Sequence, residues 1–193
     1  RQPESSIKPL IVYTPAFERG YDPNTIVDDH KFEGGPSNAT NTYAGKIPLR
    51  YAVAKSLNTV AWQVYEQVTT TVGLQYLKNM NFSSIVKDDY TLATSLGGFT
   101  KGVSPLEMAS AYAALENDGM FRQPNCIKSI VDADENVVYS SQMAEVSMYE
   151  MDATRTMTDV LTTVMDSGTG AALKLSNMPC AGKTGTTNDH KDG

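Results

Sequence analysis

The order of helical and strand patterns along the sequence limits the fold more than any other feature of the chain. Apolar residues with helical spacing recur over most of its 193 residues, and strand patterns are concentrated in the last third. A parallel sheet requires strands that alternate with helices, and this alternation is absent. The sequence therefore predicts an α+β fold, with a helical subdomain beside a sheet.

Six segments have the pattern of a helix. They span residues 5–20, 48–55, 59–68, 73–80, 104–119 and 151–165. The fifth opens with Ser104 and Pro105 and has Glu107 three positions after the serine, which predicts a capping box. The first has an apolar face, and Pro15 is expected to kink or end it.

The remaining residues predict turns and strands. Residues 21–47 are rich in Asp, Asn, Gly, Pro and Thr, which is typical of a long surface loop. Residues 127–131 and 137–139, joined by an acidic turn, predict a β-hairpin. Small residues and alternation over 179–187 predict a further strand.

Charge, cysteine and histidine content disfavour several classes of function. The net charge is −6 and the pI is near 4.9, with no basic stripe, so nucleic acid is not expected as a partner. Cys126 and Cys180 form no zinc or redox motif and are expected to be unrelated buried thiols. His30 and His190 belong to no metal-binding pattern, so we expect neither a metal nor another cofactor.

Three short motifs carry the groups that a serine acyltransferase needs. They are Ser5-Ser-Ile-Lys8, Ser56-Leu-Asn58, and the run from Lys183 to Thr187. Residues three apart on a helix share a face, so Lys8 can act as general base for Ser5. Burial and a second cation, Lys183, would lower the pKa of Lys8 and keep its amine partly neutral.

The second and third motifs can supply proton transfer and substrate binding. Ser56 can pass a proton between the lysines and a leaving group, and Asn58 offers an amide that can bind a substrate peptide bond. Lys183 and the threonines after it place a cation and several hydroxyls along one edge. Gly185 leaves room there for a substrate to pair with the strand.

Each motif taken alone is a weak signal. A chain of this length contains about one S-x-x-K match by chance, and a second copy is indeed present at Ser84–Lys87. Ser5, Ser56 and Asn58 could each cap a helix without any catalytic role. The joint order of the three motifs, together with longer matches around them, favours the catalytic interpretation.

These longer segments resemble penicillin-binding proteins, in particular the class A bifunctional type. Residues 1–9, RQPESSIKP, are similar to the R-Q-P-G-S-x-x-K-P segment of that family, and residues 49–59, 102–109 and 178–187 resemble later family segments. The resemblance implies a penicillin-binding protein/serine β-lactamase-like fold, here mostly the helical subdomain plus a truncated antiparallel sheet. Residues 1–193 would form a partial transpeptidase domain whose flanking strands and C-terminal helix are missing.

The resemblance also implies a role for each catalytic residue. Ser5 would be the acylated nucleophile and Lys8 its general base. Ser56 and Lys183 would relay protons. The backbone N–H groups of Ser5 and Thr186 would form the oxyanion hole.

The implied substrate is a peptidoglycan stem peptide that ends in D-Ala-D-Ala, with β-lactams as its mimics. The implied substrate-binding residues are Asn58, Thr184, Gly185, Thr186 and Thr187, the last two on the terminal carboxylate. The implied activity is that of a serine D,D-transpeptidase that cross-links stem peptides through an acyl-enzyme. No apolar run reaches the length of a membrane span. The resemblance implies a location at the extracytoplasmic face of a bacterial membrane through an anchor outside this sequence, with a glycosyltransferase domain in the full-length chain.

Two departures from the family pattern leave alternatives open. Glu4 stands where the family has glycine, and its carboxylate either points to solvent or impairs acylation of Ser5. The alternatives are a non-catalytic β-lactam-binding sensor or scaffold and, with less support, a serine β-lactamase, whose E-x-x-L-N loop motif is absent. Because the strand at 179–187 would lack sheet neighbours, the isolated chain is expected to be unstable.

Overall fold

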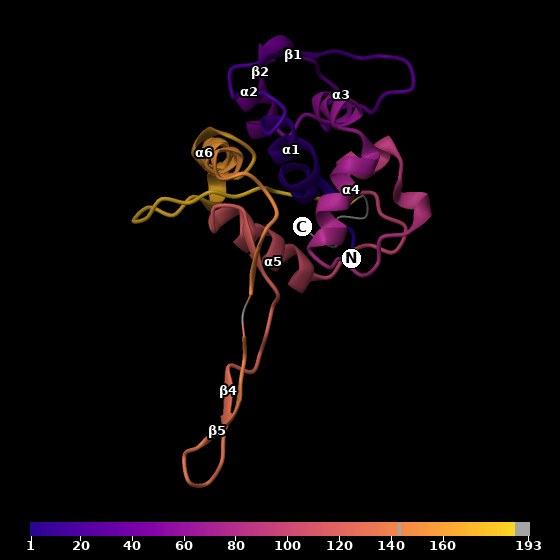
Figure 1. The fold of residues 1–193 in the computed structure, drawn as a ribbon. Helices are drawn as coiled ribbons and strands as arrows, with labels where there is room; N and C mark the ends of the chain where they lie inside the picture. Colours follow the sequence, from indigo (N-terminus) through magenta and orange to yellow (C-terminus); the bar gives the residue numbers. More distant parts are fainter. Residues whose placement is uncertain (143, 188–193) are drawn as a thin grey trace.

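The structure, a computed structural model, describes residues 1–142 and 144–187, so His190 lies outside the described residues. Its longer helices pack around the helical segment at the N-terminus (Figure 1). The α-helices are α1 (Thr14–Phe17), α2 (Leu49–Ala54), α3 (Asn58–Val68), α4 (Thr70–Asn79), α5 (Pro105–Glu116) and α6 (Met151–Ser167). Shorter helices are η1 (Glu4–Ile7), η2 (Pro9–Tyr13), η3 (Lys87–Asp89), η4 (Leu92–Leu96) and η5 (Ala171–Leu173).

The predicted helix at 5–20 is present, but it is not a regular α-helix. It runs as the 3₁₀ turn η1, the π turn η2 and the α turn α1. Pro15 lacks a backbone N–H, and just before it Thr14 donates to the Pro9 carbonyl, five residues back. Pro15 lies in the first turn of α1, so the prediction that it ends the helix is wrong. Every residue from 7 to 17 is buried, so this central segment is enclosed on all sides and does not have a single apolar face.

The other predicted helices are confirmed, with shifted ends. The helix predicted at 73–80 begins three residues earlier, at Thr70. The capping box of α5 is present, since Ser104 Oγ accepts from Glu107 N at 3.1 Å and Glu107 Oε2 accepts from Ser104 N at 2.7 Å. Together α1, α2 and α5 pack against α6.

The expectation of a surface loop over residues 21–47 is wrong in part. Strand β1 (Ile26–Asp29) pairs antiparallel with β2 (Gly45–Pro48), with Val27 opposite Ile47. Aspartates are rare in strands, so the local pattern predicts a turn. The contacts of the buried Asp29 with α3 and with residues 38 and 44 hold this segment in place.

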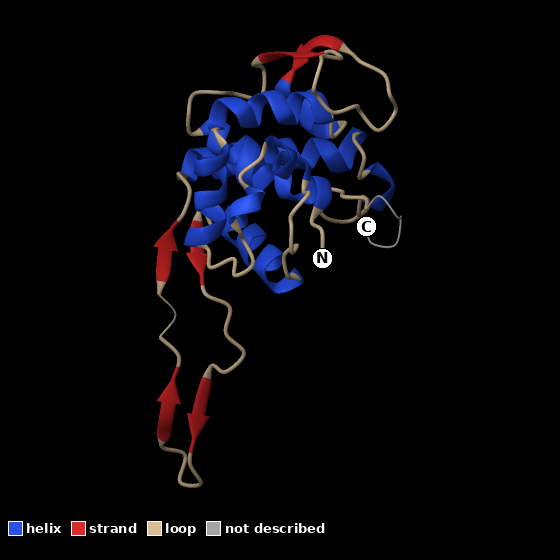
Figure 2. Cartoon of the chain, turned by 90° about the vertical axis from the view of Figure 1, so that its right-hand side faces the viewer, coloured by secondary structure: helices blue, strands red, loops and turns tan. Residues whose placement is uncertain are grey.

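An arm formed by residues 120–142 and 144–147 extends away from the helices (Figure 2). Its base is the antiparallel pair β3 (Met120–Arg122) and β6 (Glu145–Ser147), which the sequence did not reveal. Its far end is β4 (Ser129–Val131) paired with β5 (Val137–Ser140), so the predicted hairpin is confirmed. Apolar side chains on this arm are exposed, among them Val138 at 68%.

The strand predicted at 179–187 is wrong. These residues run as an irregular segment, because no strand within the described part of the chain lies beside them to complete a ladder. The three sheets among the described residues are antiparallel pairs, and the mixed fold of helices and antiparallel strands is confirmed. Cys126 and Cys180 are free thiols, but Cys126 is exposed on the arm, so the expectation that both are buried is wrong. Among the described helices, none has the length and apolar character needed to cross a bilayer.

Candidate active site

The turn that carries Ser5 is fastened by residues on both sides of it. Gln2 donates to the Phe99 carbonyl at 2.5 Å and accepts from Phe99 N at 2.8 Å. Tyr112 on α5 donates to the Ser6 carbonyl at 2.7 Å. Glu4 has a left-handed backbone, with φ 49°. These contacts fix where the first turn of the helical segment begins and therefore where Ser5 stands.

Lys8 connects the helical segment to the second motif. Its Nζ donates to the Ser56 carbonyl at 2.9 Å and to Asn58 Oδ1 at 2.8 Å, and it lies 3.4 Å from Ser56 Oγ. As predicted, Ser56 and Asn58 lie at the junction between α2 and α3. Ser56 has φ 57°, which turns the chain sharply between the two helices.

Lys183 reaches the same hydroxyl from the other end of the chain. Its Nζ donates to Ser56 Oγ at 2.7 Å and to the Thr184 carbonyl at 2.9 Å. The structure thus brings Lys8, Ser56, Asn58 and Lys183 together, as the motifs predict. A hydroxyl oxygen flanked by two amines can accept from one and donate to the other, which is the geometry of a proton relay.

The two lysines have lowered pKa values. Burial, and after it the positive charge of Lys183, hold the pKa of Lys8 well below its usual value, against a smaller opposing effect of Glu4. Burial lowers the pKa of Lys183 to about 8. A neutral Lys8 fits its two shortest contacts, because the two N–H groups of a neutral amine are enough to donate to the Ser56 carbonyl and to Asn58 Oδ1.

Ser5 itself makes no side-chain hydrogen bond to Lys8 within the described residues. Its backbone carbonyl accepts from Lys8 N, so the two residues share one helical turn. Hydrogen bonds of catalytic groups are often long before substrate binds, so the separation does not remove Ser5 as a candidate nucleophile. The second S-x-x-K copy, Ser84–Lys87, ends at the first residue of η3, and within the described residues its serine and lysine side chains make no hydrogen bond to a motif residue.

The segment 183–187 lies directly against the Ser5 turn. A Cβ on Gly185 would lie 3.0 Å from the Pro3 carbonyl oxygen and 3.4 Å from Ser6 N. Thr184 Oγ1 lies 2.6 Å from Thr169 Oγ1, which fixes it beside the end of α6. Thr186 is exposed and Thr187 is buried. The assignment of the backbone N–H groups of Ser5 and Thr186 to an oxyanion hole stays a prediction.

A buried polar cluster that sequence reasoning missed supports the second motif. Asn38 Oδ1 accepts from Asn58 N at 2.8 Å and from Thr59 N at 3.4 Å, and thus caps α3 from a distant loop. Asn38 Nδ2 donates to Asp29 Oδ1 at 2.7 Å, and Asp29 also accepts from Thr59. Leu57 precedes α3, and a leucine side chain cannot accept a hydrogen bond from the first N–H groups of a helix. This residue was the one signal in the sequence that the cap of α3 comes from elsewhere in the chain.

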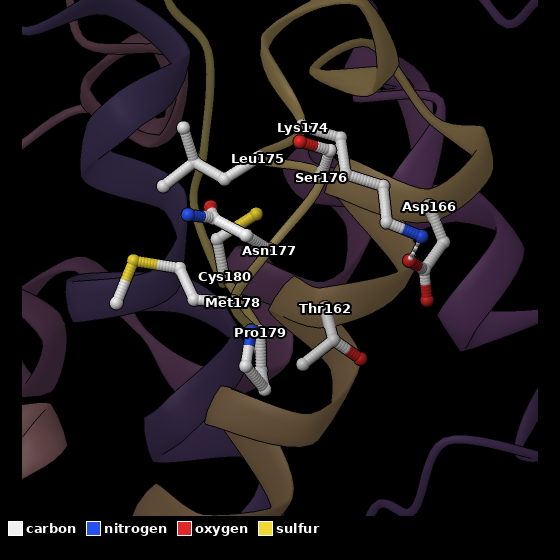
Figure 3. A pocket seen from close by; sticks show the side chains of 9 residues that line it. All are labelled: Thr162, Asp166, Lys174, Leu175, Ser176, Asn177, Met178, Pro179 and Cys180. Carbon is white, nitrogen blue, oxygen red and sulfur yellow. Dashed lines mark ion pairs between the residues drawn. The ribbon is translucent and has the colours of Figure 1, made fainter.

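One surface pocket lies away from this cluster. It has a volume of about 380 Å³ and lies between α6 and residues 174–180 (Figure 3). Lys174 and Asp166 form an ion pair at 2.6 Å on its wall. None of the motif residues lines it, so the candidate active site is identified by its chemistry and not by a cavity.

Comparison with known proteins decides the family. A model described as "Penicillin binding protein transpeptidase domain" matches residues 1–193. The chain belongs to this family. Penicillin-binding protein 4 of Bacillus subtilis is 32% identical over 100% of the chain, and penicillin-binding protein 1A/1B of the same organism is 34% identical over 97%. Such relatives are class A penicillin-binding proteins, which confirms the resemblance read from the sequence.

The chain spans only part of these relatives, 31% of the first and 21% of the second. Solved transpeptidase domains share its fold. The D,D-transpeptidase domain of a peptidoglycan glycosyltransferase from Eggerthella lenta superposes with a TM-score of 0.81 at 24% identity, over 97% of the chain and 54% of that domain. Penicillin-binding protein A from Mycobacterium tuberculosis gives 0.82 at 16% identity, over 98% and 49%.

Proposed function

We propose that this chain carries the acyl-transfer groups of a serine D,D-transpeptidase, which cross-links peptidoglycan stem peptides and is acylated by β-lactams. One observation carries the proposal: Ser56 Oγ lies 2.7 Å from Lys183 Nζ and 3.4 Å from Lys8 Nζ. Lys8 and Lys183, which lie 48 and 127 positions from Ser56 in the sequence, meet at this hydroxyl beside the turn of Ser5. Motifs that matched the sequence pattern only by chance would not be expected to meet at one hydroxyl in the folded chain.

Acylation begins when the neutral amine of Lys8 takes the proton of the Ser5 hydroxyl. The Ser5 oxygen attacks the carbonyl carbon between the two D-Ala residues, and the carbonyl oxygen becomes an oxyanion between the N–H groups of Ser5 and Thr186. The peptide C–N bond then breaks, and the departing D-Ala amine takes the proton of the Ser56 hydroxyl. Lys183 or the protonated Lys8 returns a proton to Ser56.

Deacylation runs through the same groups in reverse. An acceptor amine from a second stem peptide gives its proton to the Ser56 relay and attacks the ester carbonyl. The Ser5 oxygen leaves and recovers its proton from Lys8. Asn58 holds the donor peptide, and Thr184, Gly185, Thr186 and Thr187 form the side on which its terminal carboxylate lies. The exposed Thr186 suits this role better than the buried Thr187.

We further propose that residues 1–193 form part of a transpeptidase domain within a longer class A protein, since the chain spans 21% to 31% of two class A relatives. The longer protein would act at the extracytoplasmic face of the membrane and carry a glycosyltransferase domain. No metal or other cofactor takes part in the proposed reaction.

Labelling of the full-length protein with fluorescent penicillin tests the proposal. We expect a covalent adduct on Ser5, located by mass spectrometry of a tryptic digest, and complete loss of labelling in Ser5→Ala. Ser84→Ala is the matched control, because it removes the serine of the second S-x-x-K copy and should label like wild type. Labelling that survives Ser5→Ala would contradict the assignment of the nucleophile.

Turnover separates a transpeptidase from a sensor. Both would trap penicillin covalently, but only a transpeptidase releases D-Ala from a stem-peptide mimic and joins the acyl group to an added amine. Rapid hydrolysis of the penicillin adduct would instead indicate a β-lactamase. We expect slow release of penicillin and measurable transfer to the amine.

A further inference from the structure

The turn after α6 contacts the chain on both sides of the proton relay. It is formed by residues 168–170, which join α6 to η5. Thr169 N donates to the Ala54 carbonyl at 3.0 Å, and Ala54 ends α2 two residues before Ser56. Thr169 Oγ1 lies 2.6 Å from the hydroxyl of Thr184, which follows Lys183 directly in the sequence. A residue outside the three motifs therefore contacts the flanks of the second and of the third motif.

These contacts close a ring around the relay. The Thr184 carbonyl accepts from Lys183 Nζ at 2.9 Å, and the same Nζ donates to Ser56 Oγ at 2.7 Å. From Ser56 the chain leads back over two residues to Ala54, whose carbonyl binds Thr169 N. The hydroxyls of Thr169 and Thr184 form the remaining link. Loss of either hydroxyl opens the ring and leaves the distance between Lys183 and Ser56 less restrained.

The backbone of the turn is held in place without the Thr169 side chain. Gly168 N donates to the Thr163 and Val164 carbonyls, both at 3.1 Å, and Gly170 N donates to the Val164 carbonyl at 3.1 Å. A Cβ on Gly168 would lie 2.3 Å from the Ala54 carbonyl oxygen, so the turn lies directly against the end of α2. Replacing the Thr169 side chain should therefore remove the link to Thr184 and leave the turn intact.

The segment that carries Lys183 is not held by a sheet. In the described part of the chain no strand pairs with residues 179–187. The hydrogen bond from Gly182 N to the Leu161 carbonyl of α6 is long, at 3.4 Å. Where no ladder fixes the backbone, a side-chain link one residue from Lys183 has a direct influence on where its amine lies.

We propose that Thr169 is a positioning residue, whose hydroxyl holds Thr184 and thereby keeps Lys183 against Ser56. The inference rests on the proposed function, in which Lys183 and Ser56 bring a proton to the leaving group. Thr169 contacts none of the reacting atoms in that scheme. It acts on the rate of acylation by limiting the positions of the Lys183 amine, because a displaced proton donor transfers its proton more slowly.

The test is single-turnover labelling of the full-length protein over a range of fluorescent penicillin concentrations. This experiment separates the rate constant of acylation from the dissociation constant. Thr169→Val keeps the branched shape of the side chain and loses the hydroxyl. We expect its acylation rate constant to fall about tenfold, with an unchanged dissociation constant and complete labelling at long times.

Two control variants accompany this measurement. Thr169→Ser keeps the hydroxyl and should restore the wild-type rate. Thr162→Val removes a threonine hydroxyl on α6 that donates to the Asp159 carbonyl of the same helix at 2.7 Å, so it should also label at the wild-type rate. Wild-type kinetics in Thr169→Val would refute the inference.

A double substitution shows whether the two hydroxyls act as one link. We expect Thr184→Val to slow acylation, and the double variant with Thr169→Val to be no slower than the slower single variant. If the two losses multiply, the hydroxyls act independently and the inference is wrong. Because Thr169 is exposed, loss of its hydroxyl should change Tm little. A lower Tm and incomplete labelling, with a normal rate constant, would indicate a purely structural role and contradict the inference.

A measurement that needs no reaction with penicillin keeps this inference apart from the proposed function. Trace acetylation by acetic anhydride over a series of pH values, followed by mass spectrometry of a digest, measures the pKa of Lys183. Burial lowers this pKa to about 8, so an amine that is released toward solvent has a higher pKa.

The two results are then read separately. A higher pKa of Lys183 in Thr169→Val than in wild type supports the inference even if wild type never reacts with penicillin, a result that would refute only the proposed function. An unchanged pKa of Lys183 in Thr169→Val would refute the inference, whatever the labelling result.

Discussion

Replacing Asn38 with alanine should weaken both the fold and the reaction. The Asn38 side chain is 4% exposed and makes four hydrogen bonds, two as acceptor from the N-terminus of α3 and two as donor to Asp29 and to the Thr42 carbonyl. The alanine would leave the first N–H groups of α3 uncapped and would take one donor away from a buried carboxylate.

The expected cost follows from these contacts. Loss of a helix cap costs about 1 kcal/mol, and loss of a hydrogen bond to a charged group costs about 2 kcal/mol. Together they lower the free energy of unfolding by about 3 kcal/mol, which corresponds to a fall in Tm of about 6–12 °C for a domain of this size. Because Asn58 begins the uncapped helix, the rate of penicillin labelling should fall as well.

Differential scanning calorimetry and labelling kinetics of Asn38→Ala in the full-length protein test this reasoning. The matched control is Asn79→Ala, since Asn79 is exposed at the end of α4 and its Oδ1 accepts one bond, from Gln75 at 2.7 Å. The control should change stability by less than about 0.5 kcal/mol. If Asn38→Ala unfolds at the same temperature as the control and labels at the wild-type rate, the polar cluster does not position the second motif.

Two further predictions concern the turn of Ser5 and the second lysine. Gly97 has φ 91°, and a Cβ there would lie 2.2 Å from Glu4 Cα, so Gly97→Ala should lower the free energy of unfolding by about 3 kcal/mol or more. The control is Gly98→Ala, whose new Cβ would meet its nearest atom at 3.7 Å, so a thermal melt should show a much smaller loss of stability. Between about pH 8 and 10.5 an unfolded Lys183 holds its proton while the folded one has lost it, so Tm should rise with pH over this window and rise less in Lys183→Met. Equal pH slopes in wild type and Lys183→Met would contradict the lowered pKa.

The sequence predicted much of the site because its chemistry is carried by local motifs. A serine and a lysine three residues apart predicted one helical turn, and the structure has it. The position of Ser56 between two helices followed from the periodic patterns on either side of it. The contact of Lys183 with Ser56 came from the family resemblance and the chemistry, since no local pattern relates residues 127 positions apart.

What the sequence could not predict depends on contacts that form only in the folded chain. Asp28 and Asp29 are poor strand residues, so their pattern predicts a loop where the structure has β1. Asp29 is nevertheless buried, because Asn38, Thr59 and the Ala44 N–H surround its carboxylate. The segment 179–187 has the alternation of a strand, but a strand is defined by its neighbours. Within the described residues that segment has none, and it lies against the Ser5 turn instead.

The glycine of the third motif illustrates how the structure changes the meaning of a motif. From sequence, Gly185 was expected to leave room for a substrate. In the structure, a side chain at Gly185 would also press on the Pro3 carbonyl at 3.0 Å, and Gly97 approaches Glu4 from another element in the same way. The Ser5 turn is thus held between two glycines, and each allows backbone to approach backbone. Such close packing limits the freedom of the turn, and it explains how a strained residue such as Glu4 is kept in place directly before the nucleophile.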